Sequence, residues 1–355
     1  MKREEYLAQF QTECYLPAGS TAMNRFLSSY SDHGEQIHKT LIREFDVFFQ
    51  TVAQLQERNL MDVVHSVAVS FPYSSLLCGD PYIMFEVYPD LPFLAPKLIQ
   101  ETFSVPWIFP DWNEFYEDLL DRTKKLGLST VVRPPYIRSS MWDVARYTLH
   151  FVSTLVKCQM VDVELLPSFN SMRKADTFCI TFGEYMDWQR LIYAKLPSID
   201  IFNCEDDDSL SFRRFQSAVY EDKTFENLRL DDAQFESCMF TNCLFKQSTF
   251  RDAKFEGCDF ENCRFEQIRL DGARFSGSRL QNIEMSEVKT NCMVPGPDTI
   301  LGGFTTTDFM NCFFENLSMK QSDYSASRFQ GCQAKNMIID SSQVSSSLEL
   351  LLSQM

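Results

Sequence analysis

From Leu210 onward the chain carries an apolar or aromatic residue at every fifth position. This period fits neither a helix, which repeats its buried face about every 3.6 residues, nor a strand, which repeats about every 2 residues. The series continues without a miss to Met285, and from position 228 the residue two places before each centre is small or aliphatic. Most other positions are charged, amide or hydroxyl residues. A fixed short period predicts a repeat architecture in which successive units stack.

Two sets of residues are predicted to point inward and fill the repeat. The large centres are Phe235, Phe240, Phe245, Phe250, Phe255, Phe260, Phe265, Phe275, Phe309, Phe314 and Phe329. The small residues two places earlier are Ala233, Cys238, Cys243, Ala253, Cys258, Cys263, Ala273, Cys312 and Cys332. Large centres beside small partners provide the complementary volumes that dense packing needs.

The pattern resembles the pentapeptide repeat family, whose unit is a small residue, a polar residue, Leu or Phe, and two polar residues. The stretches CDFEN, ARFSG and AKFEG match that unit. The resemblance covers residues 210–344 and implies a right-handed quadrilateral β-helix with four units in each coil. Residues twenty apart should then stack, which places Phe235 over Phe255 and Cys238 over Cys258.

The period breaks once. A second run in a shifted register extends from Phe304 to Val344, after the stretch TNCMVPGPDTILGG. Because Pro removes a ladder donor and Pro-Gly marks a turn, we interpret 290–303 as a loop inserted between two β-helix segments, 220–289 and 304–344. The loop is either a tolerated insertion or a binding element. Its candidate interaction residues are Val294, Pro295, Gly296, Pro297 and Asp298.

Both ends of a β-helix expose unpaired backbone that must be covered. Residues 345–355 are predicted to form a C-terminal capping helix, and the alternative is a homodimer contact through the same helix. At the other end, residues 205–219 are interpreted as an acidic transition or imperfect first coil, with the first regular coil near Tyr220. The acidic stretch CEDDDS at 204–209 suits a solvated hinge.

Residues 1–204 lack the five-residue period and are predicted to form a separate α+β domain, giving a two-domain chain. All four Trp lie in this part of the sequence. Apolar spacing, caps and Pro or Gly boundaries predict the elements. The predicted helices span 34–57, 110–127, 139–158 and 186–196, and the predicted strands span 65–71, 81–89 and 176–185.

Composition narrows the possible partners and location. The formal net charge is −16, which disfavours direct binding to nucleic acid or an anionic membrane, since both need a basic surface. The N-terminus lacks the apolar stretch of a signal peptide, and no run of 18 apolar residues occurs. We expect a soluble, cytoplasmic, bacterial protein.

Cysteine and histidine usage gives little support for chemistry. None of the 12 Cys forms a CxxC pair, and the four His all lie in the first half. We interpret the Cys of the repeat as small buried residues, with redox or metal roles as alternatives. Phosphate-loop, dinucleotide, GxSxG and HExxH motifs are absent. The alternative is a Cys78 nucleophile with His65 or His150 as its base, but we expect no catalytic residues, no metal and no cofactor.

The leading hypothesis is a non-enzymatic scaffold that binds an unknown protein partner through its repeat and its N-terminal domain. The resemblance suggests an alternative, because well-known members of the family protect DNA gyrase by imitating duplex DNA. Residues 225–289, however, hold 12 acidic against 9 basic residues, which is not a continuous negative track. A third hypothesis is a ligand-sensing or enzymatic N-terminal domain with the repeat as an accessory platform.

Overall fold

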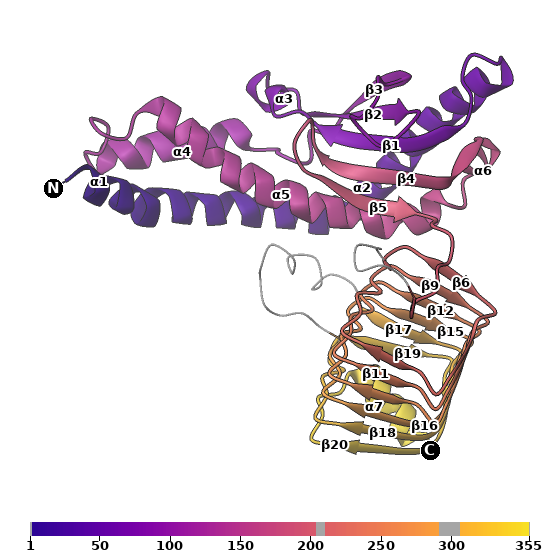
Figure 1. The fold of residues 1–355 in the computed structure, drawn as a ribbon. Coiled ribbons are helices and arrows are strands. Elements are labelled where there is room, and N and C mark those ends of the chain that lie inside the picture. The colour runs from indigo at the N-terminus through magenta and orange to yellow at the C-terminus, as the bar shows by residue number, and fades with distance from the viewer. Residues whose placement is uncertain (1, 204–209, 291–305, 355) are drawn as a thin grey trace. The chain divides into compact units, whose positions relative to one another are not determined.

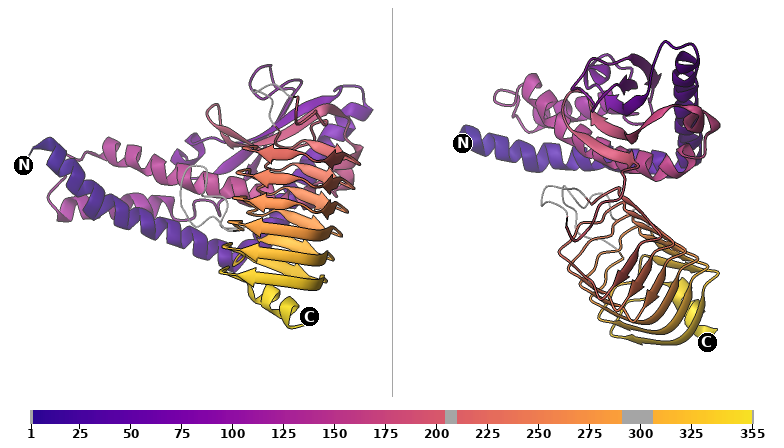
Figure 2. Two further views of the ribbon diagram at one scale, coloured as in Figure 1. Left: turned by 60° about the horizontal axis from the view of Figure 1, so that its bottom comes forward. Right: turned by 45° about the vertical axis from the view of Figure 1, so that its right-hand side comes forward.

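The computed structural model describes residues 2–203, 210–290 and 306–354. Its contacts divide the chain into two compact units, Met1–Ala194 and Lys195–Met355. The first unit contains helices and a sheet, and the second is a stack of coils (Figures 1 and 2).

The N-terminal unit begins with a long run of helix and ends with a β-hairpin. Its elements are α1 (Arg3–Gln9), a π-helix (Phe10–Tyr15), α2 (Leu16–Glu57), β1 (Val64–Phe71), α3 (Ser74–Leu77), β2 (Tyr82–Tyr88), β3 (Ile99–Ser104), α4 (Trp112–Lys125), α5 (Pro134–Val163), α6 (Pro167–Ser171), β4 (Lys174–Glu184) and β5 (Gln189–Ala194).

The sheet has the strand order β3-β2-β1-β4-β5, with β1 parallel to β4 and the other pairs antiparallel. Alternation along β1 sends Val67, Val69 and Phe71 into the main core, where residues of α2 and α5 pack against them. Figure 1 shows both helices along this face of the sheet. The apolar side chains of α2 recur at helical spacing and include Phe45 and Phe49, which are fully buried.

On the second face of the sheet, β1 contributes small and polar residues. Ser66, Ala68 and Ser70 of β1 are fully buried there. The connection from β2 to β3, residues 89–98, reaches back over this face: the Ser66 hydroxyl donates to the carbonyl of Asp90, and Lys97 pairs with the buried Glu86. Small side chains let this connection approach the sheet closely. We call residues 89–98 the strap.

The predicted helix over 186–196 is wrong. The structure has β5 there, paired antiparallel with β4 in the register Phe182↔Arg190. Two predicted helices are too short: 34–57 lies within α2, which starts at Leu16, and 139–158 lies within α5. The strands β1, β2 and β4 and the helix α4 occur where they were predicted, within a few residues at most of their ends.

The C-terminal unit consists of short strands that recur in parallel ladders. They are β6 (Arg214–Gln216), β7 (Val219–Glu221), β8 (Thr224–Glu226), β9 (Gln234–Glu236), β10 (Met239–Thr241), β11 (Leu244–Lys246), β12 (Lys254–Glu256), β13 (Asp259–Glu261), β14 (Arg264–Glu266), β15 (Arg274–Ser276), β16 (Arg279–Ser286), β17 (Thr307–Met310), β18 (Phe313–Lys320), β19 (Ser327–Gln330) and β20 (Gln333–Asp340), followed by the helix α7 (Ser346–Ser353).

Successive coils of this solenoid place equivalent residues of the sequence directly over one another. Phe235 pairs with Phe255 in one ladder, and Phe240 pairs with Phe260 in a second. A third ladder pairs Phe245 with Phe265, and isolated bridges such as Thr249↔Arg269 form a fourth line. The expected stacking of every fourth unit is therefore present.

Pairing begins earlier than the first regular coil expected near Tyr220. Phe215 of β6 already lies in register with Phe235 of β9. The ladder thus includes residues that precede Tyr220.

The ladder continues across the insertion with its register kept. Phe275 pairs with Phe309 and Met285 with Met319, although the chain between these partners contains the insertion. The sequence separation of stacked residues is therefore larger here than elsewhere in the solenoid, and the surplus lies between two stacked coils. Thr290 remains part of the wall, fully buried, and its N–H donates to the carbonyl of Asp323.

The last coil is partly covered by α7. Ser345 caps this helix by accepting a hydrogen bond from the N–H of Leu348, and Leu348 and Leu351 are buried against the solenoid. Among the described helices of both units, none combines the length and the apolar character needed to cross a bilayer.

Candidate functional site

The interior of the solenoid is packed with stacked rings. The predicted centres between Phe235 and Phe329 are all buried. The rings of Phe235 and Phe255 lie 4.9 Å apart with an interplanar angle of 4°, and Phe255 and Phe275 lie 4.5 Å apart. Adjacent centres within a coil, such as Phe235 and Phe240, meet edge to face. The interior of the described coils is therefore filled by packed side chains.

Many of the small inward residues also donate hydrogen bonds, which the sequence did not reveal. The Cys258 thiol donates to the carbonyl of Phe235 at 3.3 Å, and the Ser278 hydroxyl donates to that of Phe255 at 3.1 Å. The same bond recurs at Cys238, Cys243, Ser248, Cys263, Cys312 and Cys332. All the predicted small residues are buried except Cys332, which is half-buried. Thiol and hydroxyl groups thus donate hydrogen bonds to strand carbonyls of the preceding coil.

Outside, amide side chains form two ladders along the corners. In the first, each Asn Nδ2 donates to the Oδ1 one coil earlier, in the order Asn336, Asn316, Asn282, Asn262, Asn242 and finally Asp222. The second runs the opposite way, from Gln247 through Gln267 to Glu287. Each ladder ends on a carboxylate, which can only accept. The recurrence of Asn at the same place in every fourth unit was the available sequence signal.

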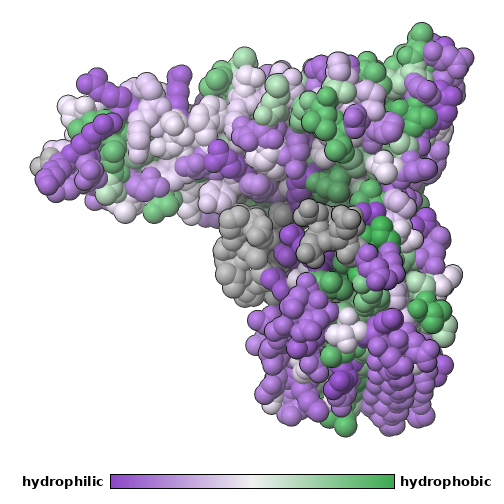
Figure 3. All heavy atoms as spheres, in the orientation of Figure 1, coloured by the Kyte–Doolittle hydropathy of each residue, from purple (hydrophilic) through white to green (hydrophobic). Residues whose placement is uncertain are grey.

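Charges on the outer faces pair between neighbouring coils. Lys246 binds Glu226 at 2.8 Å and Lys335 binds Glu315 at 2.8 Å. Arg214 donates to Glu236, and this bond holds the pKa of that carboxyl below its usual range. The visible face of the unit is mostly hydrophilic (Figure 3). The outer surface is therefore a mosaic of both signs.

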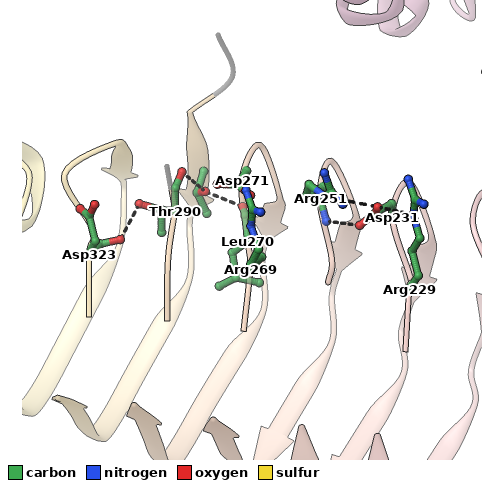
Figure 4. A network of polar contacts seen from close by, with 9 residues as sticks. Arg229, Asp231, Arg251, Arg269, Leu270, Asp271, Thr290 and Asp323 are labelled. Atoms are coloured by element: carbon green, nitrogen blue, oxygen red, sulfur yellow. Dashed lines mark hydrogen bonds and ion pairs between the residues drawn. The ribbon is translucent and has the colours of Figure 1, made fainter. Parts of the chain in front are cut away.

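One face carries a denser charge network beside the insertion (Figure 4). The buried Asp231 accepts from Arg229 Nε at 3.0 Å and from the backbone N–H of Arg251 at 3.0 Å. Arg251 Nε also lies 3.3 Å from this carboxylate. The motif Arg-Leu-Asp returns two coils later at 269–271, and Asp271 pairs with Arg269 at 2.9 Å.

Asp271 differs from Asp231 in its second oxygen. It is 1% exposed, and its Oδ1 has no hydrogen-bond partner among the described residues. Burial raises the pKa of Asp271, while Arg269 and Arg251 oppose the shift. An incompletely satisfied buried carboxylate is therefore part of the wall next to the insertion.

The two ends of the insertion lie close together. The Thr307 hydroxyl donates to the carbonyl of Leu270 at 2.6 Å and lies 3.5 Å from that of Thr290. The predicted interaction loop lies outside the described residues, as do Phe304 and the acidic stretch 204–209. The structure therefore defines where the insertion leaves and rejoins the wall.

The N-terminal unit has a hollow between α2 and α4. A cavity of about 290 Å³ is lined by Ala18, Thr21 and Arg25 of α2 and by charged residues of α4 that include Asp118 and Arg122. Arg25 binds Glu114 at 2.8 Å across it. A neighbouring hollow shares Arg25 and adds an aromatic floor from Phe26, Phe109 and Trp112. An apolar floor with a charged rim suits a small ligand.

The residues considered for catalysis lie apart or serve packing. His65 is near the start of β1, whereas Cys78 follows α3 beyond the end of that strand. His150 stacks on Trp188 at 4.1 Å, and burial lowers the pKa of His150. Within the described residues, no three His, Cys, Asp or Glu side chains gather as metal ligands would.

Comparison with known proteins identifies the type of repeat in the C-terminal unit. Residues 237–283 match the model of pentapeptide repeats, described as 9 copies. Full-length QnrB1, a plasmid-mediated fluoroquinolone resistance protein, is 14% identical over 40% of this chain and 89% of that chain, with a TM-score of 0.15. HetL, a pentapeptide repeat protein involved in heterocyst differentiation regulation from the cyanobacterium Nostoc sp. strain PCC 7120, is 10% identical over 38% of this chain and 86% of that chain, also with a TM-score of 0.15. No curated protein matches the chain.

The matched model covers none of the N-terminal unit. The predicted resemblance is confirmed for the C-terminal part, which carries the repeats of the pentapeptide repeat family.

Proposed function

We propose that this protein is a non-enzymatic scaffold. Its solenoid presents a rigid surface to one protein, and its N-terminal unit recognises a second. The observation that carries the proposal is the combination of a filled interior with an outer surface of paired charges, such as Lys246 with Glu226 and Arg328 with Asp308. A surface with fixed side chains at strand spacing suits recognition of a folded partner.

The proposal also covers the handedness and shape of the coil and the location of the protein in the cell. We propose that the coil is right-handed and four-sided, which the four parallel lines of pairing in each coil support. The protein acts in the bacterial cytoplasm and contacts neither nucleic acid nor membrane directly. Its formal net charge of −16 supports the last point.

Self-association is a further part of the proposal. Beside α7, the last coil has half-buried inward residues, Met337 and Ile339, and Ile338 on it is 65% exposed. Leu350 of α7 is also exposed. These apolar groups support a homodimer contact through the C-terminal helix.

Imitation of DNA is the less favoured alternative. A mimic needs a continuous negative track, because its target binds phosphates by releasing counterions. Here arginines interrupt the acids on the outer faces: Arg229 and Arg251 flank Asp231, and Arg269 neutralises Asp271. Ligand sensing by the N-terminal unit is a separate candidate, and the hollow between α2 and α4 is the observation that favours it.

Partner capture with the full chain, residues 1–194 and residues 195–355 tests the proposal. We expect the full chain to retain a partner that 195–355 loses, with a shallow dependence of binding on salt. We also expect 195–355 to leave gyrase supercoiling unchanged. Protection of gyrase by 195–355, with binding that falls steeply in salt, would establish the mimic instead. If neither fragment nor the full chain retains a protein, the scaffold hypothesis fails.

A further inference from the structure

Two connections at the second face of the N-terminal sheet touch each other. They are the strap (residues 89–98) and the turn between β4 and β5 (residues 185–188). The ring of Phe93 lies 6.0 Å from that of Tyr185, and Lys97 Nζ lies 5.9 Å from the same ring. Phe93 also meets Tyr88 of β2 at 5.5 Å. The two connections therefore form one continuous surface.

This surface exposes large apolar side chains. Leu91, Leu94 and Leu98 of the strap are 55%, 72% and 48% exposed, and Met186 of the turn is 71% exposed. A single exposed leucine is ordinary, whereas several on adjoining segments mark a site of interaction. We call these four residues the leucine patch.

The backbone beneath the patch is unusual in the same two places. Phe93 and Met186 have φ values of 65° and 58°. In the described part of the N-terminal unit, Asn59 is the one other non-glycine residue in this left-handed region. Asn tolerates it, but Phe and Met do not normally occur there. Residues held in such sparsely populated backbone regions cluster at functional sites.

A latch holds the strap in place. Lys97 binds the fully buried Glu86 at 2.7 Å, and Tyr88 donates to the same carboxylate at 3.1 Å. Because this pair is anchored inside the sheet, the leucines are displayed by a fixed segment. A pre-ordered surface loses little entropy on binding.

The charges around the patch define its partner. Lys97 is neutralised by Glu86, whereas Asp90 and Asp187 are exposed beside Leu91 and Met186. These two exposed carboxylates give the apolar patch an acidic edge.

We propose that the leucine patch binds an amphipathic helix of a partner protein, with apolar side chains on one face and Lys or Arg along its edges. The inference rests on the proposed role of the N-terminal unit in recognition and assigns that role to a surface. Helix binding through apolar anchors is a recurrent mode of recognition, and opposite charges on the rims set its orientation.

The test uses the full chain and a labelled synthetic helix with leucine on one face and lysine on the other. The variant Leu91→Ser/Leu94→Ser/Leu98→Ser is compared with Leu60→Ser/Leu77→Ser/Leu165→Ser, whose leucines are as exposed elsewhere in the same unit. Fluorescence anisotropy should show affinity about tenfold lower for the patch variant and unchanged for the control variant. The single variant Leu94→Ser repeats the test with minimal disturbance of the fold and no change of charge.

Several outcomes overturn the inference. One is equal affinity of the two triple variants, and another is equal binding of a leucine/glutamate helix, which would remove the role of the acidic rim. Patch-dependent binding to phosphatidylcholine vesicles would identify a bilayer as the occupant, and patch-dependent self-association in sedimentation would identify a second copy. If a captured protein partner depends on residues 1–194 but survives in the patch variant, the scaffold proposal stands and this inference fails. If the synthetic helix binds the patch variant more weakly than the control variant but no protein is captured, this inference stands and the scaffold proposal fails.

Discussion

The thiol of Cys258 donates to the backbone carbonyl of Phe235 in the preceding coil, 3.3 Å away. Ser278 makes the equivalent bond to Phe255. The two side chains therefore make the same contact, which is a hydrogen bond to a backbone carbonyl of the preceding coil. This equivalence accounts for the alternation of Cys and Ser at the small inward places, and it leads to the first prediction.

Replacing Cys258 by Ser should change the free energy of unfolding by less than about 1 kcal/mol, because the hydroxyl can replace the thiol as donor. Cys258→Val keeps the volume but removes the donor, and should cost about 1–3 kcal/mol. Urea unfolding monitored by circular dichroism measures both. Equal effects of the two substitutions would mean that the bond contributes nothing.

The exposure of the thiols provides a second prediction. Cys258 and Cys263 are fully buried, whereas Cys78 and Cys158 are exposed. The neighbouring thiol and burial together raise the pKa of Cys258. Alkylation in native buffer, mapped by mass spectrometry, should modify Cys78 and Cys158 and spare the stacked thiols until the protein unfolds. Early modification of Cys258 would contradict the packing role.

Phe255 and Glu256 offer a matched test of the register. Phe255 is 1% exposed and lies between two stacked rings, while the adjacent Glu256 is exposed. Phe255→Ala should lower the free energy of unfolding by about 3–5 kcal/mol, and Glu256→Ala should change it by about 0.5 kcal/mol or less. Similar losses from the two variants would show that the inward and outward assignments are wrong.

Asp271 should make stability depend on pH in an unusual direction. Its pKa is raised from 3.8 by burial, against the opposing effect of Arg269. The native state therefore binds the proton more tightly than the unfolded chain, and the contribution of Asp271 to stability is lost as pH rises through the raised pKa. Asp271→Asn removes this loss. Relative to wild type, the variant should therefore have a higher free energy of unfolding, and so be more stable, near pH 7 than near pH 4.

Asp231→Asn is the control for that experiment, because Asp231 accepts hydrogen bonds from both Arg229 and Arg251. It should lower the free energy of unfolding near pH 7 by about 1–3 kcal/mol. A pH dependence of Asp271→Asn in the opposite sense would show that its ion pair outweighs its desolvation.

Lys97 should control the mobility of the strap. Lys97→Met leaves Glu86 buried without its cation, so amides of residues 89–98 should exchange hydrogen faster than in wild type. Adding Glu86→Gln should recover much of the protection, since an uncharged amide costs less to bury. Unchanged exchange in Lys97→Met would mean that the aromatic contacts of Phe93 alone hold the strap.

The repeat was predictable because its information is local. Each unit carries its own large centre and small partner, so the stacking of Phe235 on Phe255 follows from their spacing in the sequence. The charge network was less accessible. Asp231 and Arg251 are twenty residues apart and stack as the period predicts, but the spacing does not reveal that Asp231 is buried and also binds Arg229.

The N-terminal unit was harder because its sheet depends on distant segments. Residues 186–196 contain good helix formers, but Arg190 pairs with Phe182 through a hairpin whose turn holds Met186 in the left-handed region. Tertiary pairing overrides propensity there. The early start of α2 was hidden by Pro17 and Gly19. Pro17 lies in the first turn of α2, and Gly19 lies so close to Val144 that an added Cβ would be 3.2 Å from its methyl group.

The ladders of the solenoid wall continue undisturbed past the segment inserted between its stacked coils. The Asn ladder crosses that level with Asn316 bonded to Asn282 at 2.8 Å, and the Phe stack crosses it with Phe309 over Phe275 at 4.9 Å. Because Thr290 and Thr307 already lie together, closing a longer segment between them costs little additional entropy. The position is a natural splice point, at which a reporter or a peptide ligand can be grafted into the chain while every coil above and below keeps its partner.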